Sequence, residues 1–385
     1  MWNGLKVIDA DAHMHEPQDL WERYVEPAFK DRVPKVAYME GTFMVYEPDG
    51  VLIPKGRPQR VPPPSAWKDI EEKYGEAYRT WWSAATRLKE MTRYGWDIQV
   101  LLPTGNNGNF AWRASLKDPQ IGAAMCRAYN NWAHDYCSED SSRLKFVAVL
   151  PGGDLKEAVK EARRAVTELG AVAVRNLVLP EGQWLHDPEC DPLWDLASEL
   201  DFPIAVHGEW RERRFQPFKD MGSDDRHKPL KAVDHAIGFP ADNMTTVGHF
   251  IFTRILERFP KLRLGILESN VGWVPFWLGR MDLHSHGRNS VMAEGDLLPK
   301  LPSEYFMDQC IVTCDGDERA LKYAIEDIGD DIIAWNTDYP HPDAPNPAEA
   351  LPDLDAQPIT HDAKRKILWD NAIKLYGPRI LTASP

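Results

Sequence analysis

Short runs of apolar and β-branched residues alternate along this chain with longer segments whose apolar positions follow helical spacing. Such short, almost continuously apolar runs are typical of parallel strands that are buried on both faces. The pattern predicts eight strands, at residues 6–10, 98–102, 146–150, 171–177, 203–206, 262–267, 309–313 and 332–335. It predicts helices between them, the clearest at residues 155–169, 192–200, 247–259 and 318–328. Strand and helix repeated eight times indicate a closed (β/α)8 TIM barrel of the α/β class.

Two segments, residues 25–90 and 210–245, are too long to be ordinary connections in such a barrel. The first is interrupted by prolines, and the second is rich in charged residues. Long insertions at the active face of a barrel build lids, pocket walls or subunit contacts. We therefore predict a single barrel domain over residues 1–385, with a lid or wall inserted at about residues 25–90.

The composition supports a large folded domain and excludes several classes of protein. Hydrophobic residues make up 43% of the 385 positions, which excludes disordered, collagen-like and coiled-coil chains. The 59 acidic and 45 basic side chains give a net charge of −14, and no long lysine or arginine run reverses it locally. Because such a surface repels phosphates, we expect no nucleic-acid partner.

The N-terminal sequence and the cysteines indicate a cytoplasmic protein. The chain does not open with a basic stretch followed by an apolar run, and it has no stretch of about 18 apolar residues that could cross a membrane. The cysteines are odd in number, 5 in all, and form no C-x-x-C pair, which favours reduced thiols. We expect no association with membranes.

Histidine and aspartate residues stand at the carboxyl ends of three predicted strands, which form the active face of a barrel. Asp11 and His13 follow the first strand, and strand alternation points them to the same side. His207 ends the fifth strand and Asp338 follows the eighth. Two imidazoles and two carboxylates suit Zn²⁺, Mn²⁺ or Fe²⁺ better than Ca²⁺. The sequence therefore predicts a divalent metal site at this face.

Several motifs extend over nearly the whole chain. They are the D-x-H start at Asp11, residues 143–151 (RLKFVAVLP), 256–263 (LERFPKLR), 272–275 (GWVP) with 279–282 (GRMD), 337–340 (TDYP) and 371–377 (NAIKLYG). Together they resemble the amidohydrolase-related family, the branch of the amidohydrolase superfamily that includes aminocarboxymuconate-semialdehyde and resorcylate-type decarboxylases. The resemblance implies a metal-dependent barrel enzyme. It also implies that the metal ligands are Asp11, His13, His207 and Asp338.

One position departs from the pattern of this family. At the end of strand six its decarboxylases carry a histidine that works as a general acid or base, whereas this chain has Glu268. A carboxylate there could shuttle a proton, activate water or bind metal directly. We expect His249 at the start of the helix after strand five, where it could act beside Glu268 as a catalytic group or ligand. If both bind metal, the site holds two ions.

Further residues near these positions are candidates for smaller roles. His15, Glu16 and His341 directly follow the predicted ligands, and we expect them behind the ligands or in solvent. Arg175, at the tip of strand four, could hold a substrate carboxylate or form a salt bridge across the barrel mouth. Trp273 could line an apolar substrate pocket or belong to the core.

Three functions remain open for such a site. The main prediction is hydrolysis or non-oxidative decarboxylation of a small carboxylated molecule, in which the ion orients the substrate and Glu268 moves the proton. The first alternative is oxidation at a dinuclear non-haem iron site. The second is a non-catalytic metal-binding partner subunit, which the complete ligand set disfavours. We also expect a homo-oligomer.

Overall fold

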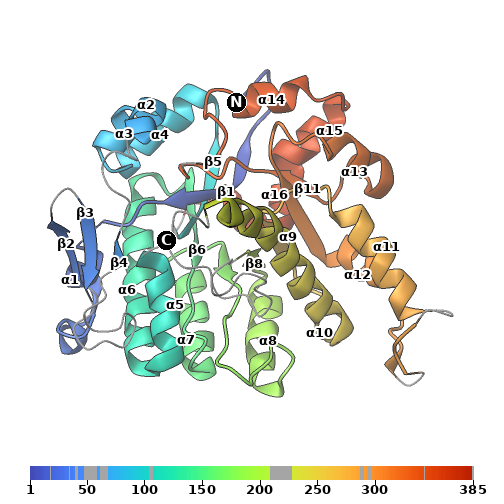
Figure 1. The fold of residues 1–385 in the computed structure, drawn as a ribbon, viewed down its shortest axis with the longest axis horizontal. Coiled ribbons are helices and arrows are strands. Elements are labelled where there is room, and N and C mark those ends of the chain that lie inside the picture. The colour runs from blue at the N-terminus through green and yellow to red at the C-terminus, as the bar shows by residue number, and fades with distance from the viewer. Residues whose placement is uncertain are drawn as a thin grey trace.

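Eight parallel strands form one sheet whose order follows the order of the chain. The computed structural model describes residues 1–17, 19–33, 35–39, 42–46, 59–60, 68–103, 107–208, 228–286, 290–293, 296–341 and 343–383. The strands are β1 (Ile8–Met14), β5 (Ile98–Pro103), β6 (Leu144–Ala148), β7 (Ala173–Arg175), β8 (Ile204–His207), β9 (Leu264–Leu267), β10 (Cys310–Cys314) and β11 (Ile333–Trp335). Each is hydrogen-bonded to the next (Figure 1).

The first and last strands of the sheet are joined by backbone hydrogen bonds, so the sheet is nearly closed. The N–H group of Asp338, beyond β11, donates to the carbonyl oxygen of Asp11 at 3.0 Å. The N–H group of His13 in β1 donates to the carbonyl oxygen of Tyr339 at 2.7 Å. Each predicted strand overlaps an observed one, and the predicted (β/α)8 barrel is confirmed.

Strand β1 extends further than predicted, and the difference matters for the site. The predicted strand ended at residue 10, but the observed strand continues to residue 14 because the whole segment is buried. Its pairing with β5 shifts register between Asp9 and Ala12. A register shift of this kind redirects the side chains next to it. Asp11 lies within the shifted stretch, and His13 lies just beyond it.

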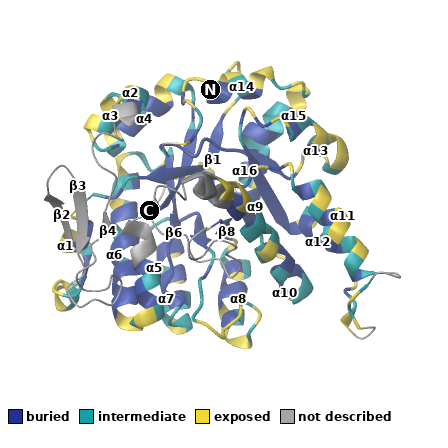
Figure 2. Ribbon diagram, viewed as in Figure 1, coloured by how far each residue is buried: buried dark blue, intermediate teal, exposed yellow. Residues whose placement is uncertain are grey.

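Helices connect the strands and cover the outside of the barrel. They are α4 (Ala84–Tyr94), α5 (Asn107–Lys117), α6 (Pro119–Cys137), α7 (Leu155–Thr167), α8 (Asp191–Leu200), α9 (Lys228–Phe252), α10 (Ile255–Arg258), α11 (Val274–Ser285), α12 (Pro302–Gln309), α13 (Leu321–Ile328), α14 (Ala350–Ala356), α15 (His361–Arg365) and α16 (Asn371–Tyr376). Figure 2 shows exposed residues on the outer helix surfaces and buried residues along the strands. No described helix is both long and apolar enough to cross a membrane.

Local sequence explains where individual helices begin. In α7 the carboxylate of Asp154 accepts hydrogen bonds from the N–H groups of Lys156 and Glu157 and so caps the first turn. Ala158 and Ala162, four residues apart, then face the core. The predicted helix at residues 155–169 therefore forms with nearly the predicted bounds.

One predicted helix is divided differently in the structure. The segment 247–259 comprises the end of α9 and the short α10, separated at Arg254, whose φ of 64° is left-handed. The apolar spacing continues across Arg254, so the pattern alone does not show the break. Helix α9 begins at Lys228, within the predicted insertion at residues 210–245, of which residues 210–227 lie outside the described part of the chain.

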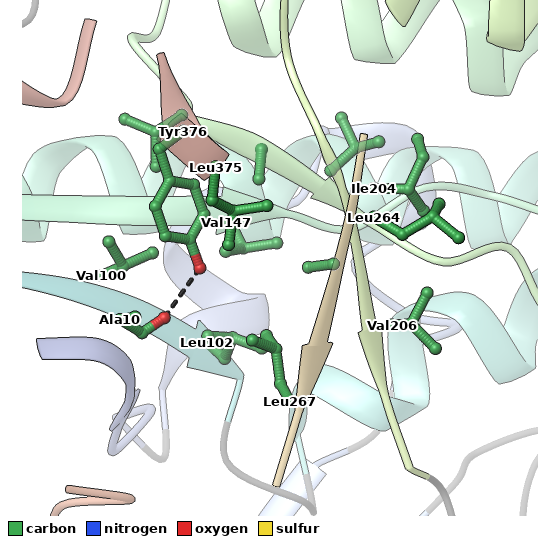
Figure 3. Packing of buried hydrophobic residues seen from close by; sticks show 14 of the residues in the cluster. Ala10, Val100, Leu102, Val147, Ile204, Val206, Leu264, Leu267, Leu375 and Tyr376 are labelled. Atoms are coloured by element: carbon green, nitrogen blue, oxygen red, sulfur yellow. Dashed lines mark hydrogen bonds between the residues drawn. The ribbon is translucent and has the colours of Figure 1, made fainter. Parts of the chain in front are cut away.

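The C-terminal helix α16 packs against the barrel core. The hydroxyl group of Tyr376 donates to the carbonyl oxygen of Ala10 in β1 at 2.7 Å (Figure 3). Leu375 lies so close to β9 that a Cβ atom at Gly265 would be 2.9 Å from its side chain, so a larger residue there would require the Leu375 side chain to shift. Aliphatic side chains of successive strands surround these contacts, among them Val100, Val147, Ile204 and Leu264. Helix α16 therefore supports strands β1 and β9, which both lead to the candidate site.

The segment between β1 and α4 adds short helices and a second, three-stranded sheet to the barrel. It contains α1 (Leu20–Tyr24), an antiparallel sheet of β2 (Lys35–Met39), β3 (Thr42–Tyr46) and β4 (Gln59–Arg60), and the helices α2 (Lys68–Tyr74) and α3 (Glu76–Arg79). The hydroxyl group of Tyr74 donates to the carbonyl oxygen of His341 at 2.6 Å. The indole N–H of Trp81 donates to the carbonyl oxygen of Glu16 at 3.0 Å. The end of this segment therefore contacts the loops that follow β1 and β11.

Candidate metal centre

Five of the predicted site residues meet at the carboxyl ends of the barrel strands. Asp11 and His13 lie in β1, His207 is the last residue of β8, and Glu268 directly follows β9. Asp338 lies in the loop after β11. The strand ends of a barrel converge on one face, so residues from both ends of the chain share this site.

The polar atoms of this group lie within ion-pair distance of one another. Nε2 of His13 is 3.0 Å from Oδ1 of Asp338 and 3.6 Å from Oδ1 of Asp11. Nε2 of His207 is 2.8 Å from Oε2 of Glu268. The rings of His13 and His207 meet edge to face, with their centroids 5.2 Å apart. The two imidazoles and the carboxylates therefore point into one small volume.

The burial of these atoms fits a bound cation. Both carboxylate oxygens of Asp11, Nε2 of His13 and of His207, Oε2 of Glu268 and Oδ1 of Asp338 are buried, and within the described chain their polar contacts are confined to this group and His341. Buried polar atoms are normally paired. A divalent ion would satisfy nitrogen and oxygen donors together. The residues present therefore fit a divalent metal ion.

His341 also joins the group, although the sequence suggested only a place behind the ligands or in solvent. Its Nδ1 lies 2.8 Å from Oδ1 of Asp338, and its ring stacks on that of His13 with the centroids 3.9 Å apart. The donor atoms of His13, Asp338 and His341 lie within 4.8 Å of one another, as do those of Asp11, His13 and His207. In the sequence, the position of His341 three residues after Asp338 is the feature that indicates a place near the site.

Burial and neighbouring charges shift the pKa values in the group. Burial lowers the pKa of His13 and of His207 to about 3, so both rings are neutral and keep a lone pair. Although burial opposes it, the Asp338 carboxylate raises the pKa of His341 to about 9. Burial, together with nearby Asp338, raises the pKa of Glu268 well above its usual range. Carboxylates crowded in this way favour a cation between them.

Hydrogen bonds to the second ring nitrogen orient the two imidazoles. Nδ1 of His13 lies 2.9 Å from the carbonyl oxygen of Pro103, and Nδ1 of His207 lies 3.3 Å from that of Gly208. A carbonyl oxygen only accepts, so Nδ1 carries the hydrogen atom in both rings. Nε2 is then the donor atom directed at the group, as in many metal-binding histidines.

A buried polar network that the sequence did not reveal supports the site. Arg87 is buried and donates to the carbonyl oxygen of His13 and, at 3.1 Å, to Oε1 of Gln99. Gln99 donates to Asp9 at 2.8 Å, and Asp9 accepts from the N–H and the hydroxyl of Thr337, at 2.9 and 2.5 Å. The network ties β1 to the loop after β11. An acidic residue inside the apolar first strand was its only sequence signal.

Two of the carboxylate residues have a left-handed backbone. The φ angle is 47° at Glu268 and 54° at Asp338. Residues with a Cβ atom rarely adopt this conformation, which costs about 1–3 kcal/mol and persists only where the surroundings hold it. Such residues cluster at active sites and ligand clamps, in agreement with a functional role for the loops that follow β9 and β11.

His249 does not belong to the group. It lies in the last turn of α9, where its Nε2 is 2.9 Å from Nδ1 of His186. Asn243, on the same helix, reaches the strand end by donating to the carbonyl oxygen of Leu267 at 2.8 Å. At 1.5 Å per residue, His249 lies about 9 Å further along the helix axis. The position predicted for His249, at the helix start beside Glu268, is wrong because α9 starts earlier than its apolar pattern indicates.

The two predicted substrate-binding residues lie at or near the barrel mouth. Arg175 ends β7 and pairs with Ala205 of β8, so it points to the same side as His207, two residues further along β8. Burial lowers the pKa of Arg175 to about 10, which leaves its guanidinium charged at neutral pH. Trp273 precedes α11, is half-buried, and its indole N–H lies 3.3 Å from Oγ of Ser269 in the loop after β9.

Comparison with known sequences relates the chain to a family of enzymes. A sequence profile of the amidohydrolase family matches residues 8–377. Over 350 residues the chain is 25% identical to the 2-amino-3-carboxymuconate-6-semialdehyde decarboxylase of Dictyostelium discoideum, covering 82% of this chain and 89% of that protein. Over 307 residues it is 24% identical to a gamma-resorcylate decarboxylase of a Polaromonas species, covering 75% and 86%.

Solved structures share the fold. An amidohydrolase from Mycobacterium avium subsp. paratuberculosis superposes with a TM-score of 0.71 at 18% identity, covering 97% of this chain and 98% of that one. A 5-carboxyvanillate decarboxylase from Novosphingobium aromaticivorans, solved with manganese and 4-hydroxy-3-methoxy-5-nitrobenzoic acid, superposes with a TM-score of 0.65 at 19% identity, covering 97% and 96%. At these sequence identities the similarity to the solved structures establishes a shared fold.

The sequence relatives agree with the main prediction, an enzyme that performs hydrolysis or non-oxidative decarboxylation. They are carboxy-lyases by name. The predicted alternatives, a dinuclear iron oxygenase and a non-catalytic metal-binding subunit, gain no support from them.

Proposed function

Because the chain belongs to the amidohydrolase family, we propose that it is a metal-dependent carboxy-lyase that removes the carboxylate of a small organic acid without an oxidant. The observation that carries the proposal is the buried, convergent group of Asp11, His13, His207 and Asp338. In the described chain the donor atoms of this group have no partner beyond one another, Glu268 and His341. The family relatives named above support decarboxylation over hydrolysis.

We assign the four residues as ligands of one divalent ion. When bound, the ion supplies a positive charge that orients an anionic substrate and polarises its oxygen atoms. Manganese is the metal we propose, because it is present in the related decarboxylase structure, and the donors also suit zinc and iron. His341 hydrogen-bonds Asp338 and so orients that carboxylate. We do not propose His249 as a ligand of a second ion, since its Nε2 faces Nδ1 of His186 at 2.9 Å.

Glu268 is the group we assign to proton transfer. In the reaction the bond between a carbon atom and its carboxylate breaks, carbon dioxide leaves, and the carbon atom keeps the electron pair and takes a proton. Glu268 lies at the strand end beside His207, with its side chain largely buried, so it can hold a proton out of bulk water. In a hydrolysis the same carboxylate would instead take a proton from the attacking water.

We propose a carboxylated aromatic compound as the substrate class. The gamma-resorcylate and 5-carboxyvanillate decarboxylases among the relatives act on such compounds by name. Arg175 offers a guanidinium on the same side of the barrel as His207, which suits a second anionic group of the substrate. Trp81, anchored at the mouth, and Trp273 offer aromatic surfaces on which a ring could stack.

Three further points are part of the proposal. The described part of the segment at about residues 25–90 serves as a wall of the barrel mouth up to the start of α4, which the Tyr74 contact to His341 supports. Residues 34, 40–41, 47–58 and 61–67 of this segment lie outside the described part of the chain. A cytoplasmic location agrees with five free cysteines, all of them buried. A homo-oligomer would cover Phe276 and Leu283, which are 62% and 50% exposed on α11.

Isotope incorporation tests the reaction. The protein loaded with Mn²⁺ is incubated in ²H₂O with a panel of carboxylated phenols, and the products are analysed by mass spectrometry. Decarboxylation with protonation predicts one deuterium at the carbon that lost its carboxylate. Products that instead gain an oxygen atom, or the two fragments of a hydrolysed bond, would contradict the proposed carboxy-lyase reaction.

A further inference from the structure

We infer that Asp315 is a positioning residue that sets Glu268 and Asp338 relative to each other by tying together the loops after β9 and β11. The inference rests on the proposed function, which gives these two carboxylates the proton and the metal. It adds a residue that neither the sequence motifs nor the ligand set identifies.

Asp315 stands at the end of the strand between the two loops. It directly follows β10, which pairs with β9 on one side and with β11 on the other. Its Oδ2 accepts a hydrogen bond from Nδ2 of Asn270 at 2.9 Å, and its Oδ1 accepts one from Nδ2 of Asn336 at 2.9 Å. One carboxylate therefore bridges three consecutive strand ends.

The two amides lie at matching distances from the functional carboxylates. Asn270 comes two residues after Glu268, and Asn336 comes two residues before Asp338. Two residues span at most about 7 Å of chain, so each amide fixes the backbone next to the side chain that acts. Asn336 is itself buried, which limits the freedom of its loop further.

The backbone of these loops needs such restraint. Glu268, Asn270 and Asp338 have φ angles of 47°, 58° and 54°, all in the left-handed region. A residue with a Cβ atom stays in this conformation only where its surroundings hold it. Released loops would relax toward ordinary backbone angles and turn both carboxylates away from His207 and His13.

A second carboxylate on the same connection holds the loop after β9 more firmly. Glu318 accepts hydrogen bonds at 2.8 Å from the N–H groups of both Val271 and Gly272. The loop that carries Glu268 is thus bound to the segment after β10 in two ways: through the side chain of Asn270 and through the backbone N–H groups of Val271 and Gly272. Asn336, in the loop after β11, makes two described hydrogen bonds to the end of β10: its N–H donates to the carbonyl oxygen of Cys314 at 3.2 Å, and its side chain donates to Asp315. The Asp315 bridge is the described side-chain contact of Asn336.

Asp315 acts through its neighbours rather than on the substrate. Both of its oxygens are occupied by amide donors, whereas the oxygens of Asp11 have no hydrogen-bond partner in the described chain. Its negative charge contributes to raising the pKa of Asp11 and of Glu268, but the bridge between the two asparagines is the feature that the structure assigns to it.

Separate removal of the two bridges tests the inference. Asn336→Ala removes the contact to the Asp338 loop, Asn270→Ala removes the contact to the Glu268 loop, and Asp315→Ala removes both. Two quantities are measured on each full-length protein: the dissociation constant of Mn²⁺, by titration of metal-free protein, and amide hydrogen exchange of the two loops by mass spectrometry. Neither quantity requires a substrate, so the inference can fail while the proposed reaction stands, and the reverse.

The two asparagine variants should differ. Asn336→Ala should weaken Mn²⁺ binding by about 10- to 100-fold, as loss of a group that orients a ligand does, and speed exchange after β11. Asn270→Ala should speed exchange only after β9 and change the Mn²⁺ dissociation constant less than about threefold. Asp315→Ala should weaken Mn²⁺ binding and speed exchange in both loops. Asp315→Asn keeps one acceptor oxygen and should therefore weaken Mn²⁺ binding less than Asp315→Ala does.

A matched control comes from α11. Asp282 accepts hydrogen bonds from the N–H and hydroxyl of Ser303 at 2.9 and 2.6 Å, and the described contacts place it away from the site. Asp282→Ala should change neither Mn²⁺ binding nor exchange in the two loops. If Asp315→Ala leaves Mn²⁺ binding unchanged, or if Asn270→Ala and Asn336→Ala weaken it equally, Asp315 supports the fold only and the inference is wrong.

Discussion

His13 shows how one side chain at the candidate site depends on the whole barrel. Its ring is oriented by Pro103 in β5, its carbonyl oxygen accepts from Arg87, and its Nε2 faces Asp338 from the opposite end of the chain. A ligand held in this way has little freedom to reorient. At the scale of single residues, we therefore expect binding of the ion to depend on each proposed ligand side chain.

Replacing His207 with alanine removes one of four proposed donors. We expect His207→Ala to weaken Mn²⁺ binding by more than the ~10- to 100-fold that loss of an outer partner costs, and to abolish activity. Metal analysis after dialysis, on the same sample as the activity, measures both. His249→Ala is the control, because His249 contacts His186 instead, and it should keep its metal. Full metal occupancy in His207→Ala would refute the ligand assignment.

Glu268→Gln separates the two roles that a carboxylate at this position could have. The amide keeps the shape but loses the charge and the ability to accept the proton. If Glu268 handles the proton, the variant should keep one metal per chain and lose roughly 10² to 10⁴ in rate. A lower metal content would show that Glu268 is a ligand. Unchanged rate together with unchanged metal content would leave it only a structural part beside His207.

The sequence predicts some site residues and cannot predict others, for a physical reason. Asp11, His13 and His207 end or follow apolar runs, and strand ends converge in every barrel, so their meeting could be predicted. Arg87 and Asp315 act by hydrogen bonds to partners on other elements. Such contacts depend on the folded arrangement, which local pattern does not contain.

At the scale of elements, the loop after β9 concentrates polar contacts from three neighbours. Asn243 of α9 donates to Ser269 at 2.9 Å, Asn270 donates to Asp315, and Glu318 accepts from the backbone N–H groups of Val271 and Gly272. A loop held by this many hydrogen bonds is a rigid support for the carboxylate it carries. Its stability should therefore depend on the ionisation of the groups that hold it.

Glu318 gives a pH dependence with a definite sign. Burial raises the pKa of its carboxyl group to about 7, against about 4.5 in the unfolded chain. Because the folded state holds the proton more tightly, the stability from protonated Glu318 is fully present below about pH 4.5 and is lost as the pH rises through 7. Glu318→Gln stays neutral. Between pH 5 and 8 the variant should therefore gain roughly 2–3 kcal/mol relative to the parent protein.

Urea unfolding of both proteins at pH 5 and pH 8 measures this difference. The comparison cancels the titration of every other group that the two proteins share. Parallel pH dependence of the two unfolding free energies would show that the Glu318 carboxyl group titrates normally. A variant that loses stability relative to the parent as the pH rises would show the opposite sign and so contradict the account.

The elements themselves illustrate what periodicity can and cannot give. The helix at residues 155–169 was predicted well, because Asp154 marks its start and alanines mark its buried face. The segment 247–259 was predicted as one helix because the apolar spacing runs on across Arg254, but the structure divides it at that residue. The same helix also begins at Lys228, earlier than the predicted residue 247, and this misplaced His249, since a position near the start of a barrel helix is at the active face and one near its end is not.

At the scale of the whole molecule, the order of the strands brings the two ends of the chain together at the candidate site. The strands pair in chain order, so that the first and the last meet, and Asp11 comes next to Asp338 through a backbone hydrogen bond of 3.0 Å. The helix α16, near the C-terminus, supports the same strand through Tyr376. The barrel was predictable from its eight alternations of strand and helix. For the insertion at about residues 25–90, the sequence predicts that it interrupts the alternation of strands and helices. It does not predict the contacts of the insertion with the barrel mouth, because these involve single side chains such as Tyr74.

The central claim is that a metal ion in this site serves decarboxylation without an oxidant. The most direct test measures carbon dioxide release and oxygen uptake together, on one sample of Mn²⁺-loaded protein acting on a carboxylated phenol. The account predicts one carbon dioxide for each substrate consumed, no oxygen uptake, loss of the activity on removal of the metal and its return when Mn²⁺ is added. Oxygen uptake in step with substrate loss, or an unchanged rate in metal-free protein, would contradict it.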